Sequence, residues 1–66
     1  MRIEVTMERA ERLAMEFDAT EDEIQKLKNG ENPFQERMEE GIPFGDISYD
    51  YAVTDMDGKT IVDWSR

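Results

Sequence analysis

The pattern of apolar and polar residues is clearest between residues 45 and 64, where the two kinds alternate on both sides of Asp57-Gly58. Such a pair between alternating runs is a strong hairpin signal, because both positions of a two-residue turn need positive φ. The predicted cross-strand pairs are Met56–Lys59, Val53–Val62 and Tyr51–Trp64. One face is then apolar, with Ile47, Tyr49, Tyr51, Val53, Val62 and Trp64. The other carries Ser48, Asp50, Ala52, Thr54, Ile61 and Asp63.

A second hairpin is predicted from residues 2–7 and 13–19, which alternate in the same way. With a turn near residues 9–11, the predicted apolar pairs are Met7–Leu13, Val5–Met15 and Ile3–Phe17. This turn contains no Gly, Asn, Asp or Pro. The apolar positions of residues 7–17 also fit a helical stripe. The alternation favours the hairpin, and a helix over residues 7–17 is the alternative.

Between the two hairpins the sequence predicts a helix over residues 21–29. Thr20 and Glu23 have the spacing of a capping box, in which each side chain bonds the other residue's backbone N–H. Gly30 suits the left-handed position that ends many helices. The residues expected to face inward are Ile24 and Leu27.

A second, shorter helix is predicted over residues 33–40. Asn32 is a favourable N-cap, and Pro33 fits the first helical position. Phe34 and Met38 are four residues apart and therefore share one side of this helix. Gly41 follows as a stop.

These elements give the order β-β-α-α-β-β and an α+β fold class. We expect a small antiparallel sheet of two hairpins with one or two short helices packed on one face. Residues 1–66 are treated as a single small domain. The pattern does not determine the order of the strands in the sheet.

Composition narrows the choice of function. The chain lacks cysteine and histidine, so it has no disulfide and lacks the commonest metal ligand. Seventeen acidic residues against eight basic ones give a net charge of −9. That charge argues against direct binding to nucleic acid or to an anionic membrane, since both need basic patches. No apolar run suits a membrane span or signal peptide, so we expect a cytoplasmic protein.

Candidate chemistry is sparse. Residues 55–58 resemble part of a calcium-binding loop, but Val53 and Trp64 stand where carboxylate ligands are required. Asp50 and Asp63 lie on the polar face of the predicted hairpin. Carboxylates on such an open face are expected to have ordinary pKa values, whereas catalytic carboxylates usually have shifted ones. The sequence therefore predicts no catalytic, cofactor-binding or metal-binding residues and no enzyme activity. We expect Trp64 and the tyrosines to be core aromatics.

The acidic side chains are the remaining functional signal. They suggest a surface that binds a basic partner and imitates the phosphates of a nucleic acid. The candidate partner-binding residues are Glu21, Asp22, Glu23, Glu36, Glu39, Glu40, Asp50, Asp55, Asp57 and Asp63.

Two hypotheses follow from this surface. The first is a non-enzymatic acidic interaction protein that docks on a basic, nucleic-acid-binding partner. Small size with strong acidity is typical of phage and mobile-element inhibitors, including anti-CRISPR and anti-restriction proteins, although no motif identifies a named family. The alternative is a small structural or assembly module that self-associates, for example through an exposed sheet edge. The oligomeric state is not predicted.

Overall fold

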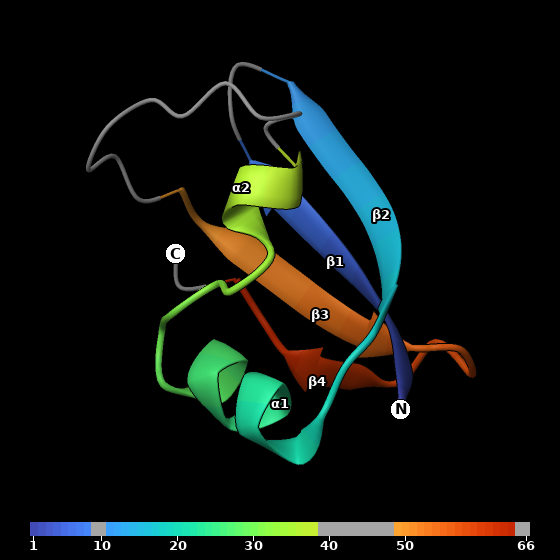
Figure 1. Ribbon diagram of the computed structural model, residues 1–66. Coiled ribbons are helices and arrows are strands. Elements are labelled where there is room, and N and C mark those ends of the chain that lie inside the picture. The colour runs from blue at the N-terminus through green and yellow to red at the C-terminus, as the bar shows by residue number, and fades with distance from the viewer. Residues whose placement is uncertain (9–10, 39–48, 65–66) are drawn as a thin grey trace.

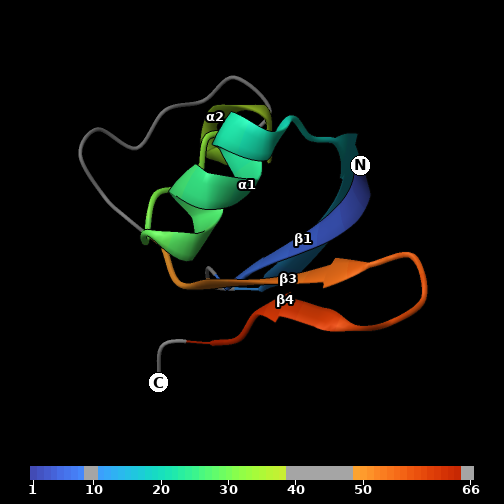
Figure 2. The ribbon, with the colours of Figure 1, turned by 90° about the horizontal axis from the view of Figure 1, so that it is seen from below.

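The computed structural model describes residues 1–8, 11–38 and 49–64. Its elements are β1 (Arg2–Glu8), β2 (Arg12–Asp18), α1 (Glu21–Lys28), α2 (Gln35–Met38), β3 (Tyr51–Asp55) and β4 (Thr60–Val62). The strands form one antiparallel sheet in the order β2-β1-β3-β4, with both helices on one side of it (Figure 1, Figure 2). The predicted α+β arrangement is confirmed, and the order places β1 and β3 at the centre.

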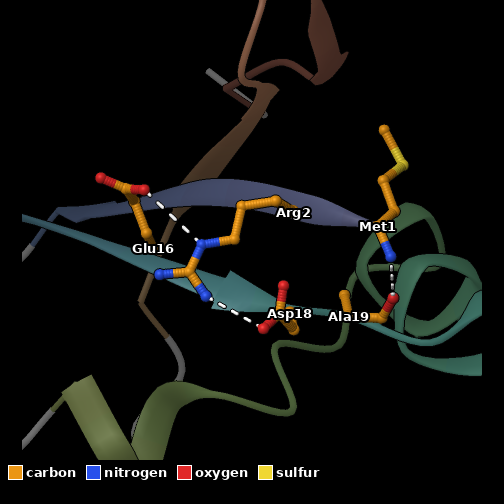
Figure 3. A network of polar contacts seen from close by, with 5 residues as sticks. All are labelled: Met1, Arg2, Glu16, Asp18 and Ala19. Carbon is orange, nitrogen blue, oxygen red and sulfur yellow. Dashed lines mark hydrogen bonds and ion pairs between the residues drawn. The ribbon is translucent and has the colours of Figure 1, made fainter.

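The first hairpin has the predicted register. Its apolar pairs are Met7–Leu13, Val5–Met15 and Ile3–Phe17. Beyond the strands, the Met1 nitrogen donates to the Ala19 carbonyl at 3.0 Å (Figure 3). The Ala19 N–H donates to the Met1 carbonyl at 2.8 Å, so the two bonds extend the ladder. The alternative helix over residues 7–17 is therefore wrong. Residues 9 and 10, which belong to the predicted turn, lie outside the described residues.

The second hairpin keeps the predicted pair Val53–Val62 but differs near its turn. The backbone N–H of Asp55 donates to the carbonyl of Lys59 at 2.9 Å, so the loop contains three residues, 56–58. Gly58 has φ of +83°, as expected for the last residue of such a loop. The Asp55 carboxylate also accepts the N–H groups of residues 57 and 59. The predicted two-residue turn, with its Met56–Lys59 pair, is therefore wrong.

A β-bulge compensates for the longer turn. Thr54 pairs with Thr60, while Val53 pairs with Val62, so Ile61 is the extra residue. Ile61 and Val62 both pack against the core, and the predicted place of Ile61 on the polar face is wrong. The predicted strand residues 45–48, including Ile47 and Ser48, lie outside the described residues.

Helix α1 begins at its predicted capping box. The hydroxyl of Thr20 accepts the N–H of Glu23 at 3.2 Å, and the Glu23 carboxylate accepts the N–H of Thr20 at 2.9 Å. The last helical residue is Lys28, one residue earlier than expected, and Gly30 has φ of +92°. Leu27 is wholly buried, and Ile24 packs at the margin of the core.

Helix α2 is shorter than predicted. The side-chain oxygen of Asn32 accepts the N–H of Phe34 at 3.0 Å and closes a turn ahead of the helix, so the prediction of Asn32 as N-cap and Pro33 as first helical residue is wrong. Residues 33–34 form a turn, and the helix proper begins at Gln35. The predicted end, with Glu39, Glu40 and Gly41, lies outside the described residues.

The core fills the space between the helices and one face of the sheet. Phe34, in the turn before α2, and Met38 in α2 are almost completely buried, and Phe34 stacks on Phe17 with ring centroids 4.3 Å apart. Tyr51 donates a hydrogen bond from its hydroxyl to the backbone carbonyl of Leu27. This bond joins β3 to the last turn of α1. Among the residues that the structure describes, the buried hydrophobic ones are Ile3, Val5, Met7, Phe17, Ala19, Leu27, Phe34, Met38, Tyr51 and Val53.

Candidate interaction surface

One face of the sheet is not covered by the two described helices (Figure 2). Since side chains alternate along a strand, this face carries the residues between the core positions. We call it the open face and define it by Arg2, Glu4, Thr6, Glu8, Arg12, Ala14, Glu16, Asp18, Ala52 and Thr54. Both helices lie on the opposite side of β1, β2 and β3 (Figure 2).

Negative charge predominates on the open face, with four carboxylates and two guanidinium groups among its ten residues. Glu4 on β1 lies directly opposite Glu16 on β2. Opposing side chains on neighbouring antiparallel strands have Cβ atoms only about 5 Å apart, and like charges in such pairs are destabilising. In the described part of the chain, Glu4 has no ion pair. The fold therefore holds like charges together at the middle of this face.

Arg2 organises the two carboxylates of β2. Its Nε lies 3.6 Å from an oxygen of Glu16, and its Nη1 lies 3.2 Å from an oxygen of Asp18 (Figure 3). The side chains of Arg2 and Glu16 are about half exposed, and that of Asp18 is 81% exposed. Ion pairs this exposed contribute only about 0–1 kcal/mol. Arg2 therefore lies between the two carboxylates, and both remain accessible to solvent.

Trp64 lies against Arg12. The guanidinium carbon of Arg12 is 4.9 Å from the ring centroid, within the range of a cation–π contact. Arg12 alternates with Leu13, which packs against the core, so it projects from the open face. Strand β4 ends at Val62, and the chain then continues on the side of the sheet away from the helices (Figure 2). The prediction that Trp64 is a core aromatic is therefore wrong.

The two tyrosines do contact the core as predicted. Tyr51 is 7% exposed, and Tyr49 packs against the core from its margin. The pKa of the Tyr51 phenol is raised, first by burial and then by the negative charges of Asp50 and Glu31. Asp50 is half-buried and accepts the N–H of Tyr51 at 3.1 Å.

The predicted partner-binding residues do not gather on one surface. Glu21, Asp22 and Glu23 lie in the first turn of α1, Glu36 on α2, Asp55 and Asp57 at the β3–β4 turn, Asp50 before β3 and Asp63 after β4. These elements lie in different parts of the molecule (Figure 1). Glu39 and Glu40 lie outside the described residues. Glu23 and Asp55 are moreover engaged in a helix cap and a turn.

The carboxylates of the open face were not among the predicted partner-binding residues: Glu4, Glu8, Glu16 and Asp18. The prediction was based on acidic residues that cluster along the chain. The signal that identifies the missed residues was already in the first hairpin, because they occupy its polar positions. Once that hairpin is paired, these four side chains lie on one side.

Other kinds of site find little support in the described residues. Among residues 1–8, 11–38 and 49–64, no group of three or more acidic side chains is placed to hold a metal ion. Met1, Ala19, Ile24 and Lys28 border a depression beside α1 that is open to solvent. Neither described helix is long and apolar enough to cross a membrane.

Comparisons of the chain with protein-family models, curated proteins and solved structures found no match. The open face therefore has to be assessed from its own charges and geometry.

Proposed function

We propose that this protein is a non-enzymatic acidic interaction protein whose open face binds a Lys- and Arg-rich surface of another protein. The observation that carries the proposal is the charge balance of this face. Its four carboxylates outnumber its two guanidinium groups, and both guanidinium groups have partners within the molecule. Arg2 pairs with the carboxylates of β2, and Arg12 lies over Trp64. The uncompensated charge is therefore negative.

The basic partner that fits best is a protein that binds nucleic acid. Such proteins have basic grooves that neutralise closely spaced phosphates. The open face presents closely spaced carboxylates on a rigid sheet, and the whole chain has a net charge of −9. Occupying such a groove would inhibit the partner, as phage and mobile-element inhibitors of restriction or CRISPR systems do.

Electrostatic binding of this kind has a specific signature. Complementary charges accelerate association, and salt weakens the effect because the Debye length falls from about 30 Å at 0.01 M to about 8 Å at 0.15 M. We therefore expect tight binding at low salt and steep weakening as salt is raised.

The test uses two variants that each lose four negative charges. The open-face variant carries Glu4→Gln, Glu8→Gln, Glu16→Gln and Asp18→Asn. The control variant carries Glu21→Gln, Asp22→Asn, Glu36→Gln and Asp57→Asn, which lie on the helices and the β3–β4 turn. Wild type and both variants are immobilised and exposed to cell lysate at low salt. We expect wild type and the control variant to retain a basic protein that the open-face variant does not retain.

A rising salt gradient completes the experiment. The retained protein is expected to elute as the salt concentration passes through roughly 0.15–0.5 M, where surface charges are largely screened. Equal retention by both variants would place the binding surface elsewhere. Retention that does not change with salt would contradict an electrostatic surface altogether.

A further inference from the structure

Among the described strands, β2 forms one edge of the sheet, and five of its seven residues are exposed. It has seven residues, no Gly or Pro, and an uninterrupted register with β1. The opposite edge, β4, has only three residues and a bulge. Short and bulged edges discourage pairing with another strand, whereas a long regular edge is a template for it. Met15, in the middle of β2, is 40% exposed although it lies on the apolar side of its hairpin.

The hydrogen bonds of the first hairpin show which backbone groups of β2 point outward. Met1 and Ala19 exchange two hydrogen bonds, so they form a hydrogen-bonded pair. Such pairs recur at every second residue of an antiparallel ladder. The odd-numbered residues of β2 therefore bond to β1. The outward N–H and C=O groups belong to Arg12, Ala14, Glu16 and Asp18.

We propose that a second copy of this chain pairs with β2 in antiparallel orientation, about a two-fold axis at Met15. Outward-pointing residues have to face outward-pointing residues, so only registers that pair even-numbered positions are allowed. The axis at Met15 satisfies this rule and overlaps the whole strand. The resulting pairs between the copies are Arg12–Asp18, Leu13–Phe17, Ala14–Glu16 and Met15–Met15.

Charge complementarity supports a second copy as the occupant. Arg12 of each copy lies opposite Asp18 of the other, so both ends of the interface join opposite charges. The Asp18 side chain is 81% exposed and has room for a second cation besides Arg2. At the centre, each Met15 covers the other. The strand is thus complementary to itself when reversed.

The neighbouring registers are less favourable. An axis at Glu16 places this residue opposite itself, and like charges directly opposite are destabilising. An axis at Ala14 pairs Arg12 with Glu16 but limits the overlap of β2 to residues 12–16. The axis at Met15 alone combines the full overlap with opposite charges at both ends.

Pairing in this way has a consequence for the open face. The two-fold axis runs perpendicular to the sheet, so the open faces of both copies lie on the same side of one eight-stranded sheet.

The two copies also repel each other, since each has a net charge of −9. Dimerisation should therefore be measured at about 0.3 M salt, where the Debye length is below about 8 Å.

The experiment is sedimentation velocity on the full chain from micromolar to submillimolar concentration. Wild type should shift from monomer to dimer as its concentration rises. Arg12→Asp and Asp18→Arg each place like charges at both ends of the interface, and each should raise the dissociation constant about tenfold or more. Mixing the two variants restores opposite charges at both ends, so the mixture should dimerise nearly as well as wild type.

Three controls keep the proposal testable. Circular dichroism should show that both variants are folded. Glu36→Arg makes the same charge change as Asp18→Arg on the exposed side of α2, and it should not raise the dissociation constant. A wild-type protein that stays monomeric, or a mixture no better than either variant alone, would overturn the proposal. Rescue of Arg12→Asp by Glu16→Arg instead would overturn the register by moving the axis to Ala14.

Discussion

The two faces of the sheet are made by the same strands but differ in solvent exposure and in charge. On the covered face, Ile3, Val5, Met7 and Val53 have no solvent exposure. On the open face, the alternate residues are mostly charged, and the side chains of Glu16 and Asp18 are 53% and 81% exposed. Neighbouring residues of β1 thus have different roles: one packs in the core, and the next is exposed and available to a partner. Substitutions on the two faces should therefore have opposite consequences.

The largest effect is expected at Phe34, which is 1% exposed and stacked on Phe17. Truncation of a buried Phe to Ala typically destabilises by about 3–5 kcal/mol. A chain of 66 residues has a total stability of roughly 3–10 kcal/mol. Phe34→Ala should therefore lose a large fraction of its free energy of unfolding, as measured by urea denaturation. Glu36→Ala, on the exposed side of α2, is the control and should change stability by less than about 0.5 kcal/mol. A cooperative, near-wild-type transition for Phe34→Ala would contradict the assigned core.

A smaller effect is expected from Tyr51→Phe, which removes the hydroxyl bonded to the Leu27 carbonyl. Loss of one partner from a buried hydrogen bond destabilises by about 1–3 kcal/mol. The lower end is expected, because this carbonyl also accepts the N–H of Gly30 at 3.3 Å. Denaturant titration at neutral pH measures the difference. An unchanged free energy of unfolding would mean that the bond does not help to join α1 to β3.

The same variant should change the alkaline dependence of stability. The pKa of Tyr51 is raised above its ordinary value of 10.0 in the folded state. Folding then holds the proton more tightly, so the contribution is complete below pH 10 and is lost as pH rises through the folded pKa. Above pH 10, the stability of wild type should fall more steeply than that of Tyr51→Phe. Parallel curves would contradict the raised pKa.

The smallest effect on stability is expected on the open face. The open-face variant removes four carboxylates, including two in exposed ion pairs and two directly opposite each other. The lost ion pairs and the relieved repulsion are both small and act in opposite directions. The free energy of unfolding should therefore stay within about 1 kcal/mol of wild type, as measured by urea denaturation. A loss of several kcal/mol would show that this face also stabilises the fold.

The two hairpins show what the sequence can and cannot predict about this fold. The first hairpin lacks a turn signal, yet its register is correct, because a slip by one residue would expose Ile3, Val5 and Met7 together. The second has the strong signal Asp57-Gly58, yet its turn is one residue longer than predicted. The bulge at Ile61 restores the pairing of the apolar residues. In both hairpins, the alternation of apolar residues predicts which core residues pair across the strands, and the turn residues do not.

The capped ends of α1 were also predictable, since Thr20, Glu23 and Gly30 act through local geometry. The strand order was not, because it depends on contacts between segments far apart in the chain. For the same reason the sequence did not show that Glu21–Glu23 and Glu36 lie on other elements than the carboxylates of the open face. The position of Trp64 was missed because alternation is informative only while a strand continues, and β4 ends at Val62.

The most direct test of the central claim compares the open-face and control variants for affinity to a peptide of eight lysines at low salt. Both variants lose four negative charges, so any difference between them reports where those charges lie. If the open face is the cation-binding surface, the open-face variant should bind about tenfold more weakly than the control variant, since several ion contacts of up to about 1 kcal/mol are lost together. Equal affinity of the two variants would contradict the claim, because it would mean that only the total charge of the protein matters.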